Sequence, residues 1–168
     1  MQRMNVIFHI ENGFSHTSHM GRMAQSFEES YTQLRAILNN DLDTTTRELQ
    51  SIETELQCAI QVYEGYKKLS GDYSSLLAIL SVSVSSLTQS LVDEKRWTKC
   101  VNDEIAFLEA QKSLRDAQMN FVIENTPDRK SAVDDAEKLL AQIVSDANHT
   151  SNCKCHMCNP FGRLSEDR

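Results

Sequence analysis

The sequence has little glycine and little proline. Among 168 residues there are five glycines and two prolines, and both prolines, Pro127 and Pro160, come late in the chain. Because proline removes a backbone donor and ends helices, the proline-free run from Met1 to Thr126 leaves room for very long helices. So few turn-forming residues do not suit a turn-rich all-β fold. The composition therefore predicts an all-α protein.

Basic residues are also in deficit. Lysine and arginine together number 17, against 24 acidic residues, which gives a formal net charge of -7. Such a chain repels the phosphates of nucleic acids and anionic membranes. No segment has the pattern of a signal peptide, and we expect no stretch that spans a bilayer and no membrane insertion. These features favour a protein of the cytoplasm or nucleus that is not secreted and that does not use nucleic acid as its main partner.

Motifs of known enzyme classes are missing as well. There is no glycine-rich phosphate loop, no G-x-S-x-G turn and no H-E-x-x-H helix. The many carboxylates stand among lysines and glutamines, where pairing between positions i and i+4 of a helix explains them. Cys58 and Cys100 fall at outward or flanking helical positions with no histidine nearby in the sequence. We therefore expect a protein that is not an enzyme.

A seven-residue repeat of apolar residues is the strongest pattern in the chain. All but Ser70, Thr98 and Glu94 of its core positions are apolar. The first set of core positions is Leu49, Leu56, Tyr63, Ser70, Leu77, Val84, Leu91, Thr98 and Ile105, and the second set is Ile52, Ala59, Tyr66, Tyr73, Leu80, Leu87, Glu94, Val101 and Leu108. We call these two sets the seam. A sustained seven-residue repeat predicts a coiled coil, because its apolar stripe is buried only by supercoiling against another helix.

The seam predicts self-association. The side chains expected to carry it are Leu49, Ile52, Leu56, Tyr63, Leu77, Leu80, Val84, Leu87, Leu91, Ile105 and Leu108. Val62, Leu69 and Leu76 widen the apolar face beyond the seam, which favours a bundle or a higher oligomer over a simple two-stranded coil.

Ser70-Gly71-Asp72 allows two arrangements of this region. Gly71 suits a helix C-terminus and Asp72 suits the cap of a new helix, so the chain can reverse here and form a helical hairpin. However, the repeat passes through Gly71 in phase, and one outward glycine costs a helix only about 1 kcal/mol relative to alanine. The unbroken phase favours a continuous rod over a hairpin reversing near Gly71.

Further signals divide the chain into four segments. Ser26 and Glu29 have capping-box spacing, which predicts that the long helix begins at Ser26 and that 1–25 is a flexible or partner-dependent segment. Thr126-Pro127-Asp128 predicts a cap, a first helical residue and a favourable charge at the positive helix end. We therefore expect a coiled-coil region at 26–125, a short C-terminal helix at 127–148, and an irregular Cys/His-rich tail at 149–168.

The tail has the composition of a zinc site. Its candidate ligands are Cys153, Cys155, Cys158, His149 and His156. Thiols of a protein that is not secreted stay reduced, so their spacing indicates metal binding rather than disulfides. Three thiolates and one imidazole would complete the tetrahedron that structural zinc prefers. Free thiols in a disordered tail, redox chemistry, or Cu(I) with Met157 are the alternatives.

Together these patterns favour a non-enzymatic, homo-oligomeric scaffold or adaptor that contacts other proteins through its tails or helix faces. The alternative is a nucleic-acid-binding accessory protein that uses the tail as a zinc knuckle. That alternative expects salt-sensitive binding through Lys154, Arg163 and Arg168. A metal-dependent or thiol enzyme is the third and least favoured hypothesis.

Overall fold

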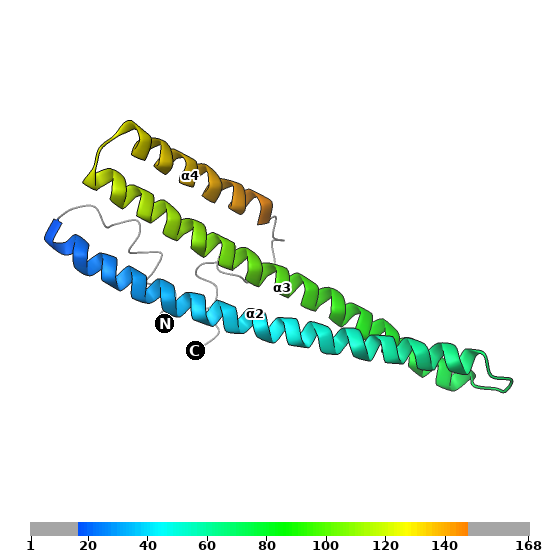
Figure 1. Cartoon of the computed structure of the whole chain (residues 1–168). Coiled ribbons are helices and arrows are strands. Elements are labelled where there is room, and N and C mark those ends of the chain that lie inside the picture. Colours follow the sequence, from blue (N-terminus) through cyan, green and yellow to red (C-terminus); the bar gives the residue numbers. More distant parts are fainter. Residues whose placement is uncertain (1–16, 148–168) are drawn as a thin grey trace, which may run out of the picture. The chain divides into compact units, whose positions relative to one another are not determined.

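The computed structural model describes residues 17–147, with side chains from Ser26 onward. It has three helices, which are α2 (Thr17–Lys67), α3 (Ser74–Ile123) and α4 (Pro127–Ala147), and the described residues form no strand (Figure 1). The predicted all-α class is confirmed.

The chain divides into two compact units. One unit comprises Met1–Asn40 together with Cys100–Arg168, and the other comprises Asp41–Lys99. We call the first the three-helix unit, because its described part holds the start of α2, the end of α3 and all of α4. We call the second the hairpin unit, because it holds the end of α2, the turn and the start of α3.

In the hairpin unit the chain reverses direction between α2 and α3 (Figure 1). Two hydrogen bonds of the tight i to i-3 type follow the end of helix α2. The Lys68 amide donates to the Gly65 carbonyl (3.2 Å), and the Leu69 amide donates to the Tyr66 carbonyl (3.1 Å). An ion pair of 3.4 Å joins Lys95 of α3 to Glu53 of α2. The continuous rod is therefore wrong, and the hairpin is the arrangement that forms.

The turn depends on Gly71 and Asp72. The amide and the hydroxyl of Ser74 both donate to Asp72 Oδ1, at 3.2 and 2.6 Å. The hydroxyl bond first, and then the amide bond, lower the pKa of Asp72. A Cβ at Gly71 would lie 2.7 Å from Tyr73 Cε2. Since the Tyr73 ring packs on that of Tyr66 at a centroid distance of 5.4 Å, glycine leaves the space that this aromatic pair occupies.

The fully buried apolar residues that the structure describes all belong to the three-helix unit. They are Phe27, Leu38, Cys100, Val101, Ile105, Leu108, Ala110 and Ala147. Three helices can enclose side chains between them, whereas two helices leave the edges of their interface open. Leu38 and Val101 are the most deeply buried of these side chains, each at 2% exposure.

Helix α4 begins as the sequence predicts. The Arg129 amide donates to Thr126 Oγ1 (3.4 Å), the Lys130 amide donates to the Thr126 carbonyl (3.0 Å), and Pro127 is the first helical residue. The residues of α4 that are at least partly shielded include Val133, Ala136, Leu140 and Ile143. The predicted helix start at Thr126-Pro127 is confirmed.

The predicted start of the long helix is wrong. Helix α2 begins at Thr17, so Ser26 lies within it rather than at its cap. A capping side chain contributes only about 1 kcal/mol, and no proline between Thr17 and Ser26 interrupts backbone hydrogen bonding there. Of the expected N-terminal segment, residues 17–25 are helical, and residues 1–16 lie outside the described part.

Helix α3 is more apolar than we expected. It contains an 18-residue window with a mean hydropathy of 1.6, none of which is buried. The window falls where Tyr73 to Val92 carry no charged residue. By length and composition alone this helix passes the test for a membrane span, so the expectation that no stretch does so is wrong. Core helices of soluble proteins pass the same test.

Candidate functional site

The predicted zinc ligands Cys153, Cys155, Cys158, His149 and His156 lie outside the described residues. Within residues 17–147, no group of three or more histidine, cysteine, aspartate or glutamate side chains has the geometry to hold a metal ion. The zinc site therefore stays a prediction from the sequence.

The predicted assembly residues are shielded to different degrees in the two units. In the hairpin unit all of them are partly shielded, namely Leu49, Ile52, Leu56, Tyr63, Leu77, Leu80, Val84, Leu87 and Leu91. In the three-helix unit Ile105 and Leu108 are buried, at 8% and 3% exposure. The chain's own helices thus shield the seam, completely in the three-helix unit and in part in the hairpin unit.

Polar residues interrupt the seam at one end of the hairpin unit. The Thr98 hydroxyl donates to the Glu94 carbonyl (2.9 Å), which satisfies that side chain within its own helix. Glu94 is different, because its Oε1 is buried and has no hydrogen-bond partner among the described residues. Burial first, and then the nearby carboxylate of Glu48, raise the pKa of Glu94. This position therefore destabilises the hairpin unit at neutral pH.

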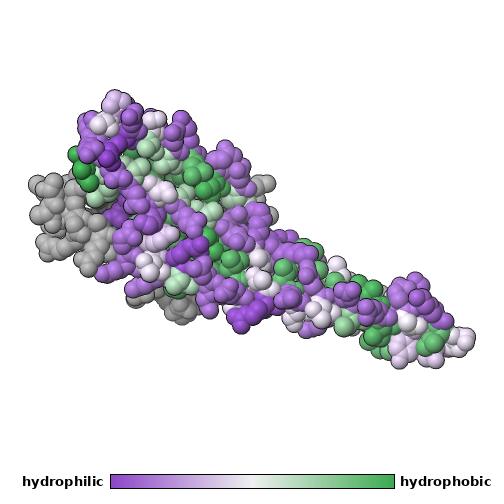
Figure 2. All heavy atoms as spheres, viewed as in Figure 1, coloured by the Kyte–Doolittle hydropathy of each residue, from purple (hydrophilic) through white to green (hydrophobic). Residues whose placement is uncertain are grey.

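Large apolar side chains are exposed on both helices of the hairpin unit. On α2 they are Ile60, Val62 and Leu69, and on α3 they are Ile79, Val82 and Val92. Ile79 and Val82 are the most exposed of these, at 64% and 71%. Hydrophobic patches are visible on this unit between polar ones in the space-filling view (Figure 2). The hairpin unit thus exposes large apolar side chains on both of its helices.

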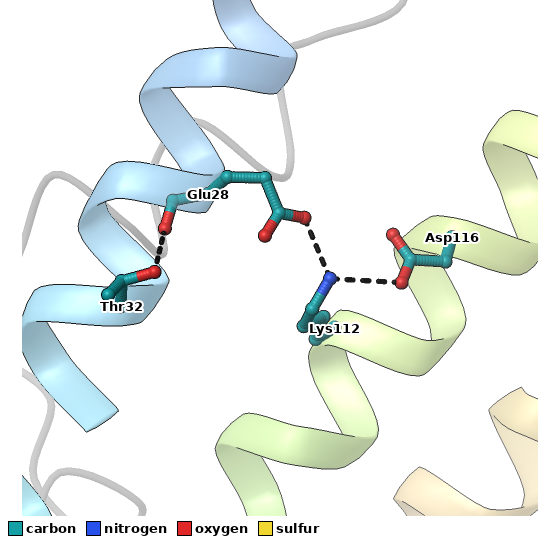
Figure 3. A network of polar contacts seen from close by, with 4 residues as sticks. All are labelled: Glu28, Thr32, Lys112 and Asp116. Atoms are coloured by element: carbon teal, nitrogen blue, oxygen red, sulfur yellow. Dashed lines mark hydrogen bonds and ion pairs between the residues drawn. The ribbon is translucent and has the colours of Figure 1, made fainter. Parts of the chain in front are cut away.

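A polar network joins α2 and α3 in the three-helix unit (Figure 3). Lys112 Nζ donates to Glu28 Oε1 (2.7 Å) and to Asp116 Oδ2 (3.1 Å), while the Thr32 hydroxyl donates to the Glu28 carbonyl (2.7 Å). The bond to Glu28 is the main cause that raises the pKa of Lys112, with burial opposing it. A lysine held in its charged form is a poor nucleophile and a poor base. The network is suited to pairing helices rather than to catalysis.

Aromatic rings lie beside this network. The Arg115 guanidinium is 3.9 Å from the centre of the Phe27 ring, and Lys112 Nζ is 5.4 Å from that of Tyr31. Phe27 is buried at 6% exposure. Burial lowers the pKa of Arg115, and the charges of Glu28 and Asp116 oppose that effect. These cation-π contacts attach charged side chains of α3 to aromatic rings of α2.

One more interhelical pair lies further along the same two helices. Arg35 of α2 donates through Nε (3.1 Å) and Nη2 (2.8 Å) to the same oxygen, Oε1, of Glu109 on α3. Arg35 also bonds Asn39 within α2. Together with the Glu28–Lys112 pair, this contact fixes the antiparallel register of α2 and α3 within the three-helix unit. The sequence carries no signal for these pairs, because their partners lie far apart along the chain.

The two cysteines of the helices have different surroundings. Cys58 is exposed, as its outward position predicts, whereas Cys100 is buried at 6% exposure. Cys100 belongs to the three-helix unit, and the seven-residue repeat alone does not reveal its burial. The exposed apolar residues of α3 were also missed, although the uncharged run from Tyr73 to Val92 was a usable signal.

Comparison of the chain with models of protein families, with curated proteins and with solved structures found no match.

Proposed function

We propose that this protein is a non-enzymatic, homo-oligomeric coiled-coil scaffold or adaptor that mediates protein-protein interaction. In this proposal the helices set the oligomeric state. The tail formed by His149, Cys153, Cys155, His156 and Cys158 binds a structural zinc ion and acts as a recognition element. Repeating that element around an oligomer raises avidity without new contacts.

The pattern of shielded residues in the hairpin unit supports the coiled-coil part of the proposal. In the hairpin unit the partly shielded positions follow the seam through both helices, from Leu49 to Tyr66 on α2 and from Leu77 to Thr98 on α3. The residues between them are mostly exposed. A stripe of this period is what coiled-coil packing of antiparallel helices requires.

The observation that carries the proposed self-association is the incomplete cover of the hairpin unit. Among the described residues of this unit, only Thr45 is buried, at 3% exposure, whereas the leucines of the seam are partly exposed. Ile79 and Val82 are exposed on the outside of the same unit. Since apolar surface removed from water contributes about 25 cal/mol per Å², a second copy that covers this unit stabilises both copies.

The non-enzymatic part is supported by the state of the charged groups. Lys112 and Arg35 are engaged with carboxylates of the opposite helix. These pairs stabilise helix pairing at the surface by at most about 1 kcal/mol each.

The test is the mass of the purified full chain in solution. Light scattering and equilibrium sedimentation over a wide concentration range should give a mass that is a multiple of that of one 168-residue chain. A mass of one chain at every concentration refutes the proposed homo-oligomer. Small-angle scattering of the same samples gives the particle length.

A further inference from the structure

The two units differ in how completely they bury their side chains. The buried apolar residues that the structure describes all lie in the three-helix unit, whereas among the described residues of the hairpin unit Thr45 alone is buried. The parts of a protein with the fewest buried apolar contacts open at a lower free energy than the rest, often as one cooperative segment. We therefore expect the hairpin unit to open while the three-helix unit stays folded.

Polar residues gather in the seam at the end of the hairpin unit away from the turn. Thr45 lies one repeat before Ile52 and so continues the seam on α2, while Glu94 and Thr98 are seam positions of α3. We call these three residues, together with Glu48, the polar end of the seam. A polar residue at a core position of paired helices lowers their stability.

The hydrogen bonds at the polar end of the seam are unequally satisfied. The Thr45 hydroxyl donates to the Leu42 carbonyl (3.1 Å), and the Thr98 hydroxyl donates to the Glu94 carbonyl (2.9 Å). The carboxylate of Glu94 differs, because its Oε1 is buried with no hydrogen-bond partner among the described residues. Water reaches this oxygen once α2 and α3 separate, so the unsatisfied acceptor favours the open hairpin.

The charged residues near Glu94 on α3 are engaged with other groups. Within four residues of Glu94 they are Asp93, Lys95 and Arg96. Lys95 pairs with Glu53 of α2 (3.4 Å), and Arg96 pairs with Asp93 (3.6 Å). The two neighbouring cations are therefore paired with carboxylates other than that of Glu94.

The charge that acts on Glu94 from α2 is a second carboxylate. Burial first, and then the charge of Glu48, raise the pKa of Glu94. Within four residues of Glu48 the only charged residue is Arg47, whose Nε donates to the Asp43 carbonyl (3.1 Å). The closed hairpin thus binds a proton at Glu94 more tightly than the open one.

We propose that the hairpin unit is an acid-responsive element, which opens at neutral pH while the three-helix unit stays folded and closes when Glu94 takes up a proton. This inference goes beyond the proposed function and does not depend on the number of copies. A carboxyl pKa that folding raises contributes stability that is fully present below the unfolded value and is lost as pH rises through the folded value. Closing is therefore favoured near pH 4.5, the ordinary pKa of a glutamate, relative to pH 7.

The test is amide hydrogen exchange of the full chain at pH 4.5 and pH 7, followed by mass spectrometry. Rates are divided by the intrinsic exchange rate at each pH, at a concentration where sedimentation gives one mass at both. At pH 7 the amides of 49–66 and 77–92 should exchange at least about tenfold faster than those of 102–117. Lowering the pH should slow the first two ranges at least about twofold more than the third.

Three variants assign the pH response to its source. Glu94→Gln keeps the size of the side chain but removes its charge, so its hairpin unit should exchange equally slowly at both pH values. Glu48→Gln removes the second cause alone and should slow exchange at pH 7 by less than Glu94→Gln does. Glu55→Gln is the matched control, because Glu55 is an exposed glutamate of α2 one repeat after Glu48. It should exchange as the unchanged chain does.

Each outcome decides the proposal. Equal exchange rates in the two units at pH 7 refute separate opening of the hairpin unit. A pH response that persists in Glu94→Gln, or that Glu55→Gln also abolishes, assigns the response to other carboxylates and overturns the role of Glu94. The mass of the particle is measured separately, so these results leave the proposed oligomer to its own test.

Discussion

Replacing Glu94 by leucine should stabilise the hairpin unit, although the change removes a charged residue from an acidic chain. Glu94 occupies a seam position, its Oε1 is buried without a hydrogen-bond partner in the described part of the chain, and Glu48 lies close enough to raise its pKa. Leucine is the residue that the other seam positions most often carry.

The size of the effect follows from two contributions. An unsatisfied buried acceptor costs about 1–3 kcal/mol, and the lower end applies because Glu94 is only partly shielded. Burying a leucine contributes about 1.5–3 kcal/mol when it is complete, and about half of that here. We therefore expect Glu94→Leu to raise the free energy of unfolding by about 2 kcal/mol, which corresponds to about 4–8 °C in Tm for a chain of this length.

The pH dependence gives an independent check of the same reasoning. The folded-state pKa of Glu94 lies above its ordinary value of 4.5. A raised carboxyl pKa contributes stability that is fully present below the unfolded value and is lost as pH rises through the folded value. The advantage of Glu94→Leu should therefore be smallest near pH 4, grow as the pH rises above 4.5, and become constant at neutral pH.

The assay is urea unfolding followed by the fluorescence of Trp97, the single tryptophan, which lies in the hairpin unit. Glu55→Leu is the control, because Glu55 is an exposed glutamate of the same unit whose side chain accepts a bond from Ser51. It should change stability by no more than about 0.5 kcal/mol. If Glu94→Leu is no more stable than the unchanged chain at pH 7, or if its advantage does not depend on pH, the assignment of Glu94 to a destabilising seam position is refuted.

Three further changes test other parts of the molecule. Gly71→Ala should destabilise the hairpin unit by about 1 kcal/mol, because its Cβ would displace the Tyr73 ring from Tyr66; Trp97 fluorescence in urea measures this, and unchanged stability would contradict the role of the aromatic pair. Lys112→Met should cost about 0.5–1 kcal/mol by removing the ion pairs with Glu28 and Asp116. Since its folded pKa is raised above 10.5, this cost should persist below pH 10.5 and fade as the pH rises through the folded value; thermal unfolding followed by circular dichroism tests it, with a pH-independent difference as the contrary result. Native mass spectrometry should find one zinc ion per chain, lost on chelation or when Cys153, Cys155 and Cys158 are replaced by serine, and a mass that chelation leaves unchanged would exclude the site.

A strong local signal in the sequence predicted one helix boundary correctly, namely the start of α4. Thr126 and Pro127 mark the start of α4, and its inward face follows from the spacing of its apolar residues. Ser26 and Glu29 gave a misleading signal, because capping residues are tolerated inside a helix whose hydrogen bonds continue on both sides. A cap is a preference of about 1 kcal/mol and yields to stronger constraints.

The choice between rod and hairpin shows what a repeat in the sequence leaves open. The seam keeps its phase through Gly71 in either arrangement, because seven-residue spacing of Tyr66 and Tyr73 is compatible with a straight helix and with a turn between them. The Ser74 bonds to Asp72 and the packing of the two tyrosine rings occur only in the turned chain. Those contacts are tertiary, and neither spacing nor propensity measures them.

By itself, the sequence determined that the chain is helical, which positions of the seam turn inward, and where α4 begins, since these depend on the order of residues along a single helix. The tertiary structure decided that α2 and α3 reverse and that Arg35 and Lys112 find partners more than seventy positions away along the chain. It also decided that Cys100 is buried while Ile79 and Val82 are exposed. The physical reason is that burial depends on which second and third helix covers a side chain. A repeat along one helix shows which side is apolar and must be buried, but not which helix packs against that side.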